Sequence, residues 1–233
     1  MTIPARLIRS AACRSLPLAV ALTLPLPARG ADVSFTVSDA NKQPLADAVV
    51  VLHPLKRAVP PATPAATLEI EQRNTRFNPF VTVVRTGSAV RLPNHETRIA
   101  HHVYSTSAPK PFEFPLYKPG KAETVVLDKP GLVVLGCNIH DSMVAYVLVL
   151  DTAWFAKTPA SGNATLSGVT PGRWRAEVWH PLLKEGVKGG EAVPLQREVT
   201  IAAGDAAPNL AFSLSLGPDP RRRGPMGVGG GYK

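Results

Sequence analysis

The chain has 233 residues, of which 45% are hydrophobic and 18% charged, so it is long enough for one or two packed domains and is not a disordered polymer. Its 24 prolines disfavour long helices, and its two cysteines exclude a disulfide-rich scaffold, a multi-cysteine zinc module and an iron–sulfur ferredoxin. The net charge of +9 comes mainly from the ends: residues 1–30 contribute +4 and residues 217–233 contribute +3, which leaves +2 between them. A charge that small predicts no nucleic-acid-binding face.

The first 30 residues are predicted to be a cleavable export signal. Three arginines precede an apolar run at 16–27, which is too short to span a membrane, and small residues suit cleavage after Gly30. We therefore expect a periplasmic mature protein with no stable membrane insertion. Cleavage removes Cys13 and leaves Cys137 as a lone thiol in an oxidising compartment, where it needs to be buried, catalytic or metal-bound.

The rest of the chain is predicted to be all-β, because short β-branched and apolar runs alternate with turn signals and no stretch keeps a 3.6-residue apolar period. The predicted strands, in chain order, are 33–37, 48–52, 68–72, 81–85, 89–92, 101–105, 123–127, 131–135, 143–150, 164–166, 174–179, 198–201 and 210–216. Residues 57–67 are predicted to be a proline/alanine linker. Residues 217–233, rich in glycine, proline and arginine, are predicted to be a disordered basic tail.

Residue types that ligate metals gather between positions 101 and 143. Cys137, His140 and Met143 have the spacing C-x₂-H-x₂-M, which places thiolate, imidazole and thioether on one tight loop between two predicted strands. A histidine from a distant strand completes the set. A thiolate with two imidazoles is a trigonal donor set for copper, and a methionine sulfur is a weak axial ligand. The pattern therefore predicts one copper site with a thiolate and two imidazoles as its main ligands and Met143 as the weak axial ligand.

Two adjacent histidines compete for the remaining ligand position. Alternate side chains of a strand share a face, so His101 and Val103 point one way and His102 points the other. If Val103 marks the core, His101 is the ligand and His102 hydrogen-bonds the ligand loops from outside the metal. Asn94 and Asn138 are the other residues expected in this supporting role.

Zinc and a thiol nucleophile are the competing interpretations of the same residues. A thioether suits zinc less well than thiolate, imidazole or carboxylate does. A nucleophilic cysteine with a histidine base would need an acidic residue to orient the base, and Asp141 is the one evident candidate. A copper ion held by these four ligands leaves no open position for a substrate, and the sequence lacks the His-x-His pairs of multicopper oxidases. We therefore predict a protein that is not an enzyme.

Across about residues 68–152 the chain resembles the cupredoxins, or type 1 blue copper proteins. The ligand loop is as short as that of amicyanin, and 77–94 is similar to the family's opening pattern, with Phe77-Asn-Pro-Phe80, Gly87 and Pro93-Asn94. The segments 101–105 and 129–141 resemble a bacterial periplasmic group labelled plastocyanin-like or methylamine utilisation proteins. The resemblance implies a Greek-key sandwich that exchanges one electron with a periplasmic redox protein.

The chain also departs from that family at two places. His102 stands where amicyanin and plastocyanin have asparagine after the first ligand, and the ligand loop lacks their proline. These departures leave the predicted copper ligands in place and bear on the reduction potential and on partner docking.

The segments on either side of the copper domain, which we place at 68–156, resemble two parts of one β-sandwich. Residues 31–56 are similar to the opening of a carboxypeptidase-regulatory-like, transthyretin-type sandwich, and the continuation appears only in residues 157–216. Each part alone is too small for a good core. We therefore predict that the copper domain is inserted between two strands of this flanking sandwich.

The flanking sandwich adds weak carbohydrate binding as an alternative function, because this class is also called carbohydrate-binding-like. Trp174, Trp179 and His180 are the candidates for stacking on a sugar, although the two tryptophans fall on opposite faces of one strand and at least one is then a core residue. The main prediction is a periplasmic one-electron carrier. The alternative is a non-catalytic copper-binding or carbohydrate- or partner-binding structural protein.

Overall fold

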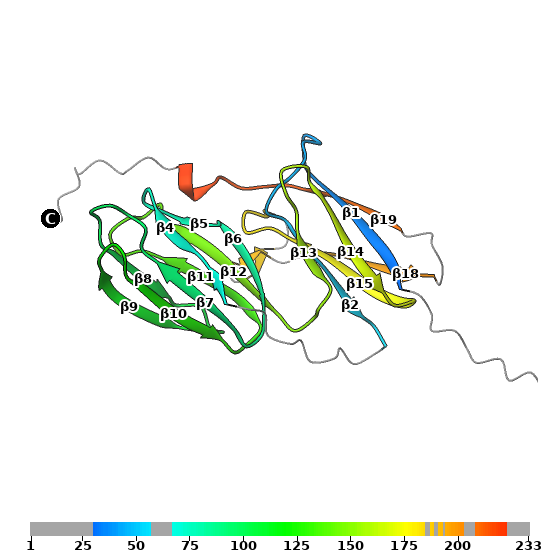
Figure 1. The fold of residues 1–233 in the computed structure, drawn as a ribbon. Coiled ribbons are helices and arrows are strands. Elements are labelled where there is room, and N and C mark those ends of the chain that lie inside the picture. The colour runs from blue at the N-terminus through cyan, green and yellow to red at the C-terminus, as the bar shows by residue number, and fades with distance from the viewer. Residues whose placement is uncertain are drawn as a thin grey trace, which may run out of the picture.

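Figure 1 shows the computed structural model, which describes residues 30–56, 67–184, 187–188, 191–192, 194–202 and 208–222. Residues 1–29 of the predicted signal, nearly all of the predicted linker, and residues 223–233 lie outside the described residues. Within the described ranges the regular structure is strand, apart from one 3₁₀ turn, so the all-β prediction is confirmed. No helix in these ranges has the length and apolar character needed to cross a membrane.

The described strands build two β-sandwiches, which we call the flanking sandwich and the inserted sandwich (Figure 1). The flanking sandwich contains β1 (Ala31–Asp39), β2 (Val49–Pro54), β13 (Phe155–Lys157), β14 (Asn163–Val169), β15 (Gly172–Trp179), β18 (Leu195–Ile201) and β19 (Asn209–Leu214). The inserted sandwich contains β3 (Leu68–Glu69), β4 (Glu71–Arg73), β5 (Arg76–Asn78), β6 (Val81–Arg85), β7 (Ser88–Pro93), β8 (His101–Ser105), β9 (Phe112–Tyr117), β10 (Ala122–Leu127), β11 (Gly131–Gly136) and β12 (Val144–Leu150). A short pair, β16 (Val187–Lys188) and β17 (Glu191–Ala192), and the turn η1 (Pro220–Arg222) complete the described elements.

The flanking sandwich is assembled from both ends of the chain. Its sheets have the strand orders β14-β1-β19 and β13-β2-β15-β18, so β1 and β2 pair with strands that follow the insertion. The period-2 apolar pattern of β1 buries Val33, Phe35 and Val37 against Trp174 and other core residues of the facing sheet. The predicted split sandwich is therefore confirmed. Because β13 pairs with β2, the inserted sandwich ends before β13 and not at residue 156.

The inserted sandwich packs a sheet of order β10-β7-β3 against one of order β6-β12-β11-β8-β9. In β12, every second residue is buried, and the same alternation in β7 and β10 supplies the facing layer. The core between the sheets continues to one end of the domain, where it includes Cys137 and Met143. The predicted ligand loop therefore closes the apolar core at that end.

An apolar interface joins the two sandwiches. Val49 and Trp179 of the flanking sandwich are buried together with Phe80 and Val81 of the inserted one. The ammonium group of Lys157 donates to the carbonyl of Val81 over 2.9 Å, which adds a polar link beside the apolar contacts. The insertion is thus packed against the domain that interrupts it in sequence.

Residues 217–222 lie across this junction and are ordered, so the prediction of disorder is wrong for this part of the tail. The N–H of Gly217 donates to the carbonyl of Leu182. Arg221 forms an ion pair with Asp219 at 2.7 Å, and its guanidinium carbon lies 3.5 Å from the centroid of the Phe80 ring. This cation–π contact fastens η1 to the inserted sandwich.

The three candidate sugar-stacking residues are all buried. Trp174 is 2% exposed within the flanking core, and its indole N–H donates to the carbonyl of Thr170 over 3.0 Å. Trp179, on the opposite face as expected, is 4% exposed at the interface between the sandwiches, and His180 is also 4% exposed. These side chains therefore offer no open surface for a sugar ring.

We predict that His180 makes the stability of the fold depend on pH. Burial lowers its pKa from 6.5 to about 4, and its Nδ1 accepts a hydrogen bond from the N–H of Leu182 at 3.1 Å. Between pH 6.5 and 4, His180 is protonated in the unfolded chain but stays neutral in the folded chain. The free energy of unfolding therefore decreases as the pH is lowered through this range, by up to about 3 kcal/mol. Urea unfolding of wild type and His180→Asn across this range measures the difference. Equal pH dependence of the two proteins would show that His180 is not held neutral.

Candidate metal centre

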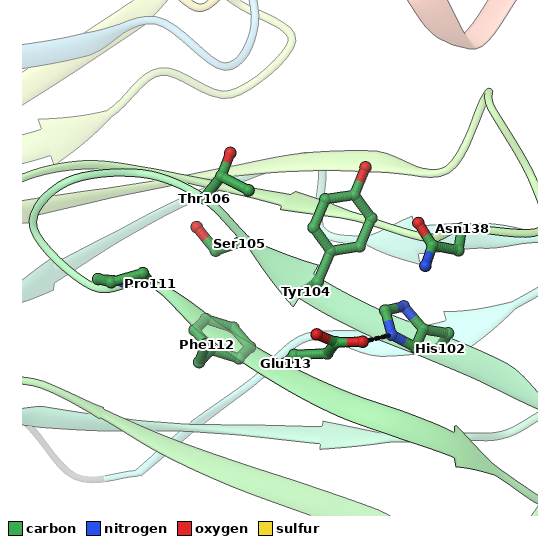
Figure 2. A pocket seen from close by; sticks show the side chains of 8 residues that line it. All are labelled: His102, Tyr104, Ser105, Thr106, Pro111, Phe112, Glu113 and Asn138. Atoms are coloured by element: carbon green, nitrogen blue, oxygen red, sulfur yellow. Dashed lines mark hydrogen bonds and ion pairs between the residues drawn. The ribbon is translucent and has the colours of Figure 1, made fainter.

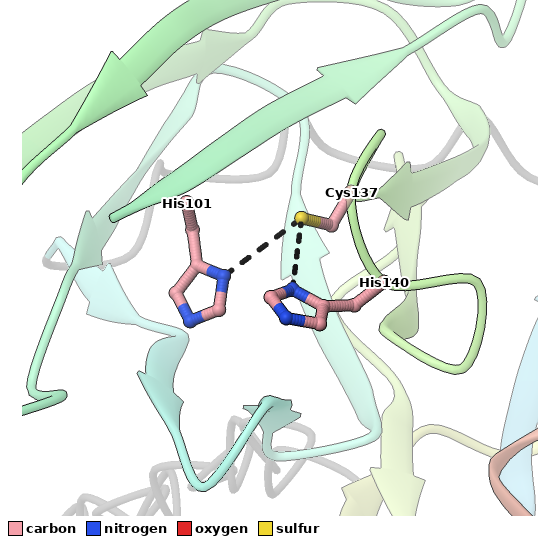
Figure 3. A group of neighbouring side chains, drawn as sticks. All are labelled: His101, Cys137 and His140. Atoms are coloured by element: carbon pink, nitrogen blue, oxygen red, sulfur yellow. Dashed lines mark hydrogen bonds between the residues drawn. The ribbon is translucent and has the colours of Figure 1, made fainter. Parts of the chain in front are cut away.

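Three side chains with metal-binding atoms converge at one end of the inserted sandwich. His101 opens β8, Cys137 directly follows β11, and His140 lies in the loop before β12. The donor atoms all lie within 4.8 Å of one another, and the sulfur of Cys137 is 3.8 Å from Nδ1 of each histidine (Figure 3). The planes of the two imidazoles are inclined at 64°, with ring centroids 5.0 Å apart.

Strand pairing explains this convergence. β11 and β12 are antiparallel neighbours with Gly136 opposite Val144, so residues 137–143 form the closed end of a hairpin. β8 lies on the other side of β11, where Tyr104 is opposite Gly136. A Cβ at Gly136 would come within 2.9 Å of the Tyr104 ring, so glycine allows this close approach of β8 to the ligand loop.

The structure brings His101, and not His102, to Cys137. His101 and Val103 are both fully buried and share the core face of β8, which agrees with the alternation argument from the sequence. His102 points to the opposite face. Met143 is 1% exposed and lies in the same apolar cluster as Cys137, and its N–H donates to the carbonyl of His140 over 2.9 Å. Met143 thus occupies the buried end of the ligand loop.

The surroundings of Cys137 favour its thiolate. Burial alone would raise the pKa of the thiol, but hydrogen bonding to His101 and to the backbone N–H groups of Ile139 and His102 outweighs burial and lowers it. His102 therefore touches the site through its backbone N–H. Because the thiolate is the form that binds metal, these contacts favour binding of a metal cation by the sulfur.

Glu96 is a site residue that the sequence reasoning missed. Its carboxylate lies 3.2 Å from Nε2 of His101 and accepts the N–H of Thr75 over 2.6 Å. Burial lowers the pKa of His101, but Cys137 and Glu96 on either side of the ring outweigh this and raise it. The carboxylate holds the proton on Nε2 and leaves Nδ1 facing the sulfur, as outer carboxylates do for metal-bound histidines. A carboxylate five positions before a candidate ligand was the available signal.

Asn94, which the sequence analysis predicts to support the ligand loops, hydrogen-bonds the backbone of Glu96. Asn94 is fully buried, and its side-chain oxygen accepts the N–H of Glu96 over 3.0 Å. Its amide group donates to the carbonyls of Ile99 and Tyr117 at 2.9 and 3.0 Å. Asn94 therefore shapes the loop that carries the chain from β7 to His101.

His102 and Asn138 line a groove beside the centre (Figure 2). Nε2 of His102 lies 2.8 Å from the carboxylate of Glu113, on the neighbouring strand β9, and its Nδ1 is buried with no hydrogen-bond partner in the part of the chain that the structure describes. Asn138 is exposed next to it. The expected side-chain contact from His102 to the ligand loop is thus replaced by the contact to Glu113.

The burial of the three donors increases from the loop to the strand. His140 is half-buried, with its pKa lowered by burial and by the charge of His101, whereas Cys137 is 5% exposed and His101 is fully buried. Ile139 and Asp141, on either side of His140, are exposed. Of the three donors, His140 is therefore the one nearest to solvent.

Comparison with solved structures finds copper proteins, at low identity and over part of the chain. A purple cupredoxin from Nitrosopumilus maritimus is 19% identical, with 36% of this chain and 99% of that chain covered and a TM-score of 0.33. A mutant of amicyanin in its reduced Cu(I) form is 17% identical over 40% of this chain and 97% of that one, with a TM-score of 0.34. A copper-containing nitrite reductase from Thermus scotoductus SA-01 is 21% identical over 50% of this chain and 28% of that one, with a TM-score of 0.35. No family model and no curated protein sequence matches this chain.

Proposed function

We propose that this protein is a periplasmic one-electron carrier that holds one type 1 copper ion through His101, Cys137 and His140, with Met143 as a weak axial ligand. The observation that carries the proposal is the close approach of one sulfur and two imidazole nitrogens, within 4.8 Å of one another, in a buried site. Bound copper would supply a centre that alternates between Cu(I) and Cu(II). A thiolate and two imidazoles are acceptable to both states.

The residues around the donors fit this group. The ligand loop closes an apolar core, which excludes water from the sulfur side, and the hydrogen bonds to Cys137 stabilise its negative charge. Because His101 is fixed by Glu96 and the loop is pinned between two strands, the donors keep their places when the charge of the site changes. Such rigidity favours electron transfer with little rearrangement.

The half-buried position of His140 makes its ring the proposed route for the electron. The other two protein donors are enclosed, so a redox partner would approach over the loop that carries His140. An enzyme is disfavoured because the four ligands leave no position for a substrate. The export signal proposed for residues 1–30 would place the protein, and hence its partner, in the periplasm.

Copper binding with redox cycling is the decisive test. We predict that the full-length protein loaded with Cu(II) is intensely coloured, that ascorbate bleaches it, and that reoxidation restores the colour. Cys137→Ser should lose the colour and have a much lower affinity for copper, because the thiolate is the strong charged ligand. Optical titration and copper analysis measure both. Copper that binds without colour or reversible bleaching would favour the alternative of a structural or copper-storing protein.

Met143 should act differently from the thiolate. We predict that Met143→Leu keeps coloured copper and has a higher reduction potential, because removing an axial donor destabilises Cu(II) more than Cu(I). Spectroelectrochemical titration measures the potential, with Leu127→Met, a substitution of a buried core residue at the far end of β10 from the ligand loop, as the control. A lower potential in Met143→Leu would contradict the axial role.

Glu96 should raise the affinity for copper without touching it. We predict that Glu96→Ala lowers Cu(II) affinity about 10- to 100-fold, because the imidazole of His101 loses the carboxylate that orients it. Competition with a chelator measures the affinity, and Glu69→Ala, which removes a carboxylate from an exposed ion pair with Arg91, is the matched control. Equal affinity of wild type and Glu96→Ala would show that the carboxylate does not act on the ligand.

A further inference from the structure

We propose that a cavity between the two sandwiches binds a small, neutral aromatic molecule that carries one N–H donor. The cavity has a volume of about 190 Å³ and lies at the junction of the sandwiches, where β2 and β15 face β11 and β12 (Figure 1). Its lining residues are separate from the candidate metal donors and from the residues that hydrogen-bond them. The inference therefore does not depend on the proposed copper function.

Both sandwiches contribute apolar walls to this cavity. The flanking sandwich supplies Val51 and Trp179, which are 2% and 4% exposed, and the inserted sandwich supplies Leu132, Leu148 and Leu150, which are half-buried. Leu132 and Leu148 are paired across β11 and β12, toward the end of this hairpin that lies away from the ligand loop. Because the three leucines keep exposed surface, a small molecule can reach the cavity while both sandwiches stay folded.

The volume of the cavity selects a ligand of one or two fused rings. An apolar cavity of about 150 Å³ stays free of water and binds benzene. Pockets for drug-sized ligands are larger, at about 300–1,000 Å³, and a strand or helix of a partner protein needs more space still. Apolar ligand pockets with a few polar groups also occur preferentially at domain interfaces, which is where this cavity lies.

Glu177 provides the polar group of the cavity. Its carboxylate accepts a hydrogen bond from Nε of Arg175 over 2.7 Å, and its other oxygen lies 3.2 Å from Nε2 of His53. Burial would raise the pKa of Glu177, but His53 and Arg175 outweigh burial and lower it, so the carboxylate is charged. Each carboxylate oxygen can accept a further hydrogen bond, which leaves room for a donor on the ligand.

The charges at the cavity favour a neutral donor over an ion. Glu177 is the one charged side chain among the described residues that line the cavity, and Arg175 already compensates its charge. A cationic ligand therefore gains little, and an anionic ligand meets a carboxylate. A neutral N–H group can donate to Glu177 while the rings of the ligand pack against the indole of Trp179 and the leucines. Indole combines a two-ring apolar body with one N–H donor and is the probe.

Methyl NMR of the full-length, metal-free protein tests the site. Indole should shift the methyl signals of Val51, Leu132, Leu148 and Leu150 in a saturable way, because a ring in the cavity lies against both sandwiches. 1-Methylindole, which lacks the donor, should bind about tenfold more weakly, since the hydrogen bond to a charged group is lost. Tryptamine, the cationic analogue, and indole-3-acetate, the anionic one, should also bind more weakly than indole.

Variants that fill the cavity give the second arm of the test. Leu148→Phe should abolish the indole-induced shifts at Val51 and Leu132, and Leu150→Phe repeats the test if the first variant does not fold. The matched control Leu116→Phe, at an exposed leucine of β9 outside the cavity, should keep the shifts. Equal shifts in wild type and a folded cavity variant, or unsaturable shifts spread over the surface, would overturn the site. Binding of 1-methylindole or tryptamine as tight as that of indole would overturn the assigned ligand class.

Discussion

The pairing of β8 with β11 is the constraint on which the candidate centre depends. His101 and Cys137 are 36 positions apart, and their donor atoms meet because β8 and β11 are neighbours in one sheet and β11 turns directly into the ligand loop. Gly136 permits the close approach of these strands under the Tyr104 ring. Two of the three donors come from a single hairpin end, so the strand that carries the third donor determines whether the site exists.

The residues outside the donor set determine its protonation and rigidity. Asn94 holds Glu96, and Glu96 holds His101, so a chain of hydrogen bonds runs from the buried end of β7 to the ring that faces the sulfur. On the other side of the site, backbone N–H groups support the thiolate. Buried polar groups of this kind are costly unless they are paired, and here they are paired with one another and with nearby backbone groups.

Local patterns in the sequence were enough for the strands that enter the core and for the face of β8 on which each of the two histidines lies. The predicted bounds 81–85 and 101–105 coincide with β6 and β8, because β-branched alternation and burial agree there. β9 was not predicted, because Pro115 interrupts its strand pattern. The structure tolerates this proline because β9 is the edge strand of its sheet. Contacts that depend on tertiary packing could not be read from spacing: Glu113 with His102, and Arg221 with Phe80.

The flanking sandwich and the centre are linked by the course of the chain, because β12 leads from the ligand loop to the apolar interface with Trp179.

The proposed copper centre is defined by the identity of its donors. X-ray absorption and electron paramagnetic resonance of the copper-loaded full-length protein test it most directly. We expect one short sulfur bond and two nitrogen bonds to a single copper, with the small copper hyperfine splitting of a highly covalent thiolate bond. A copper coordinated by nitrogen and oxygen alone would contradict it.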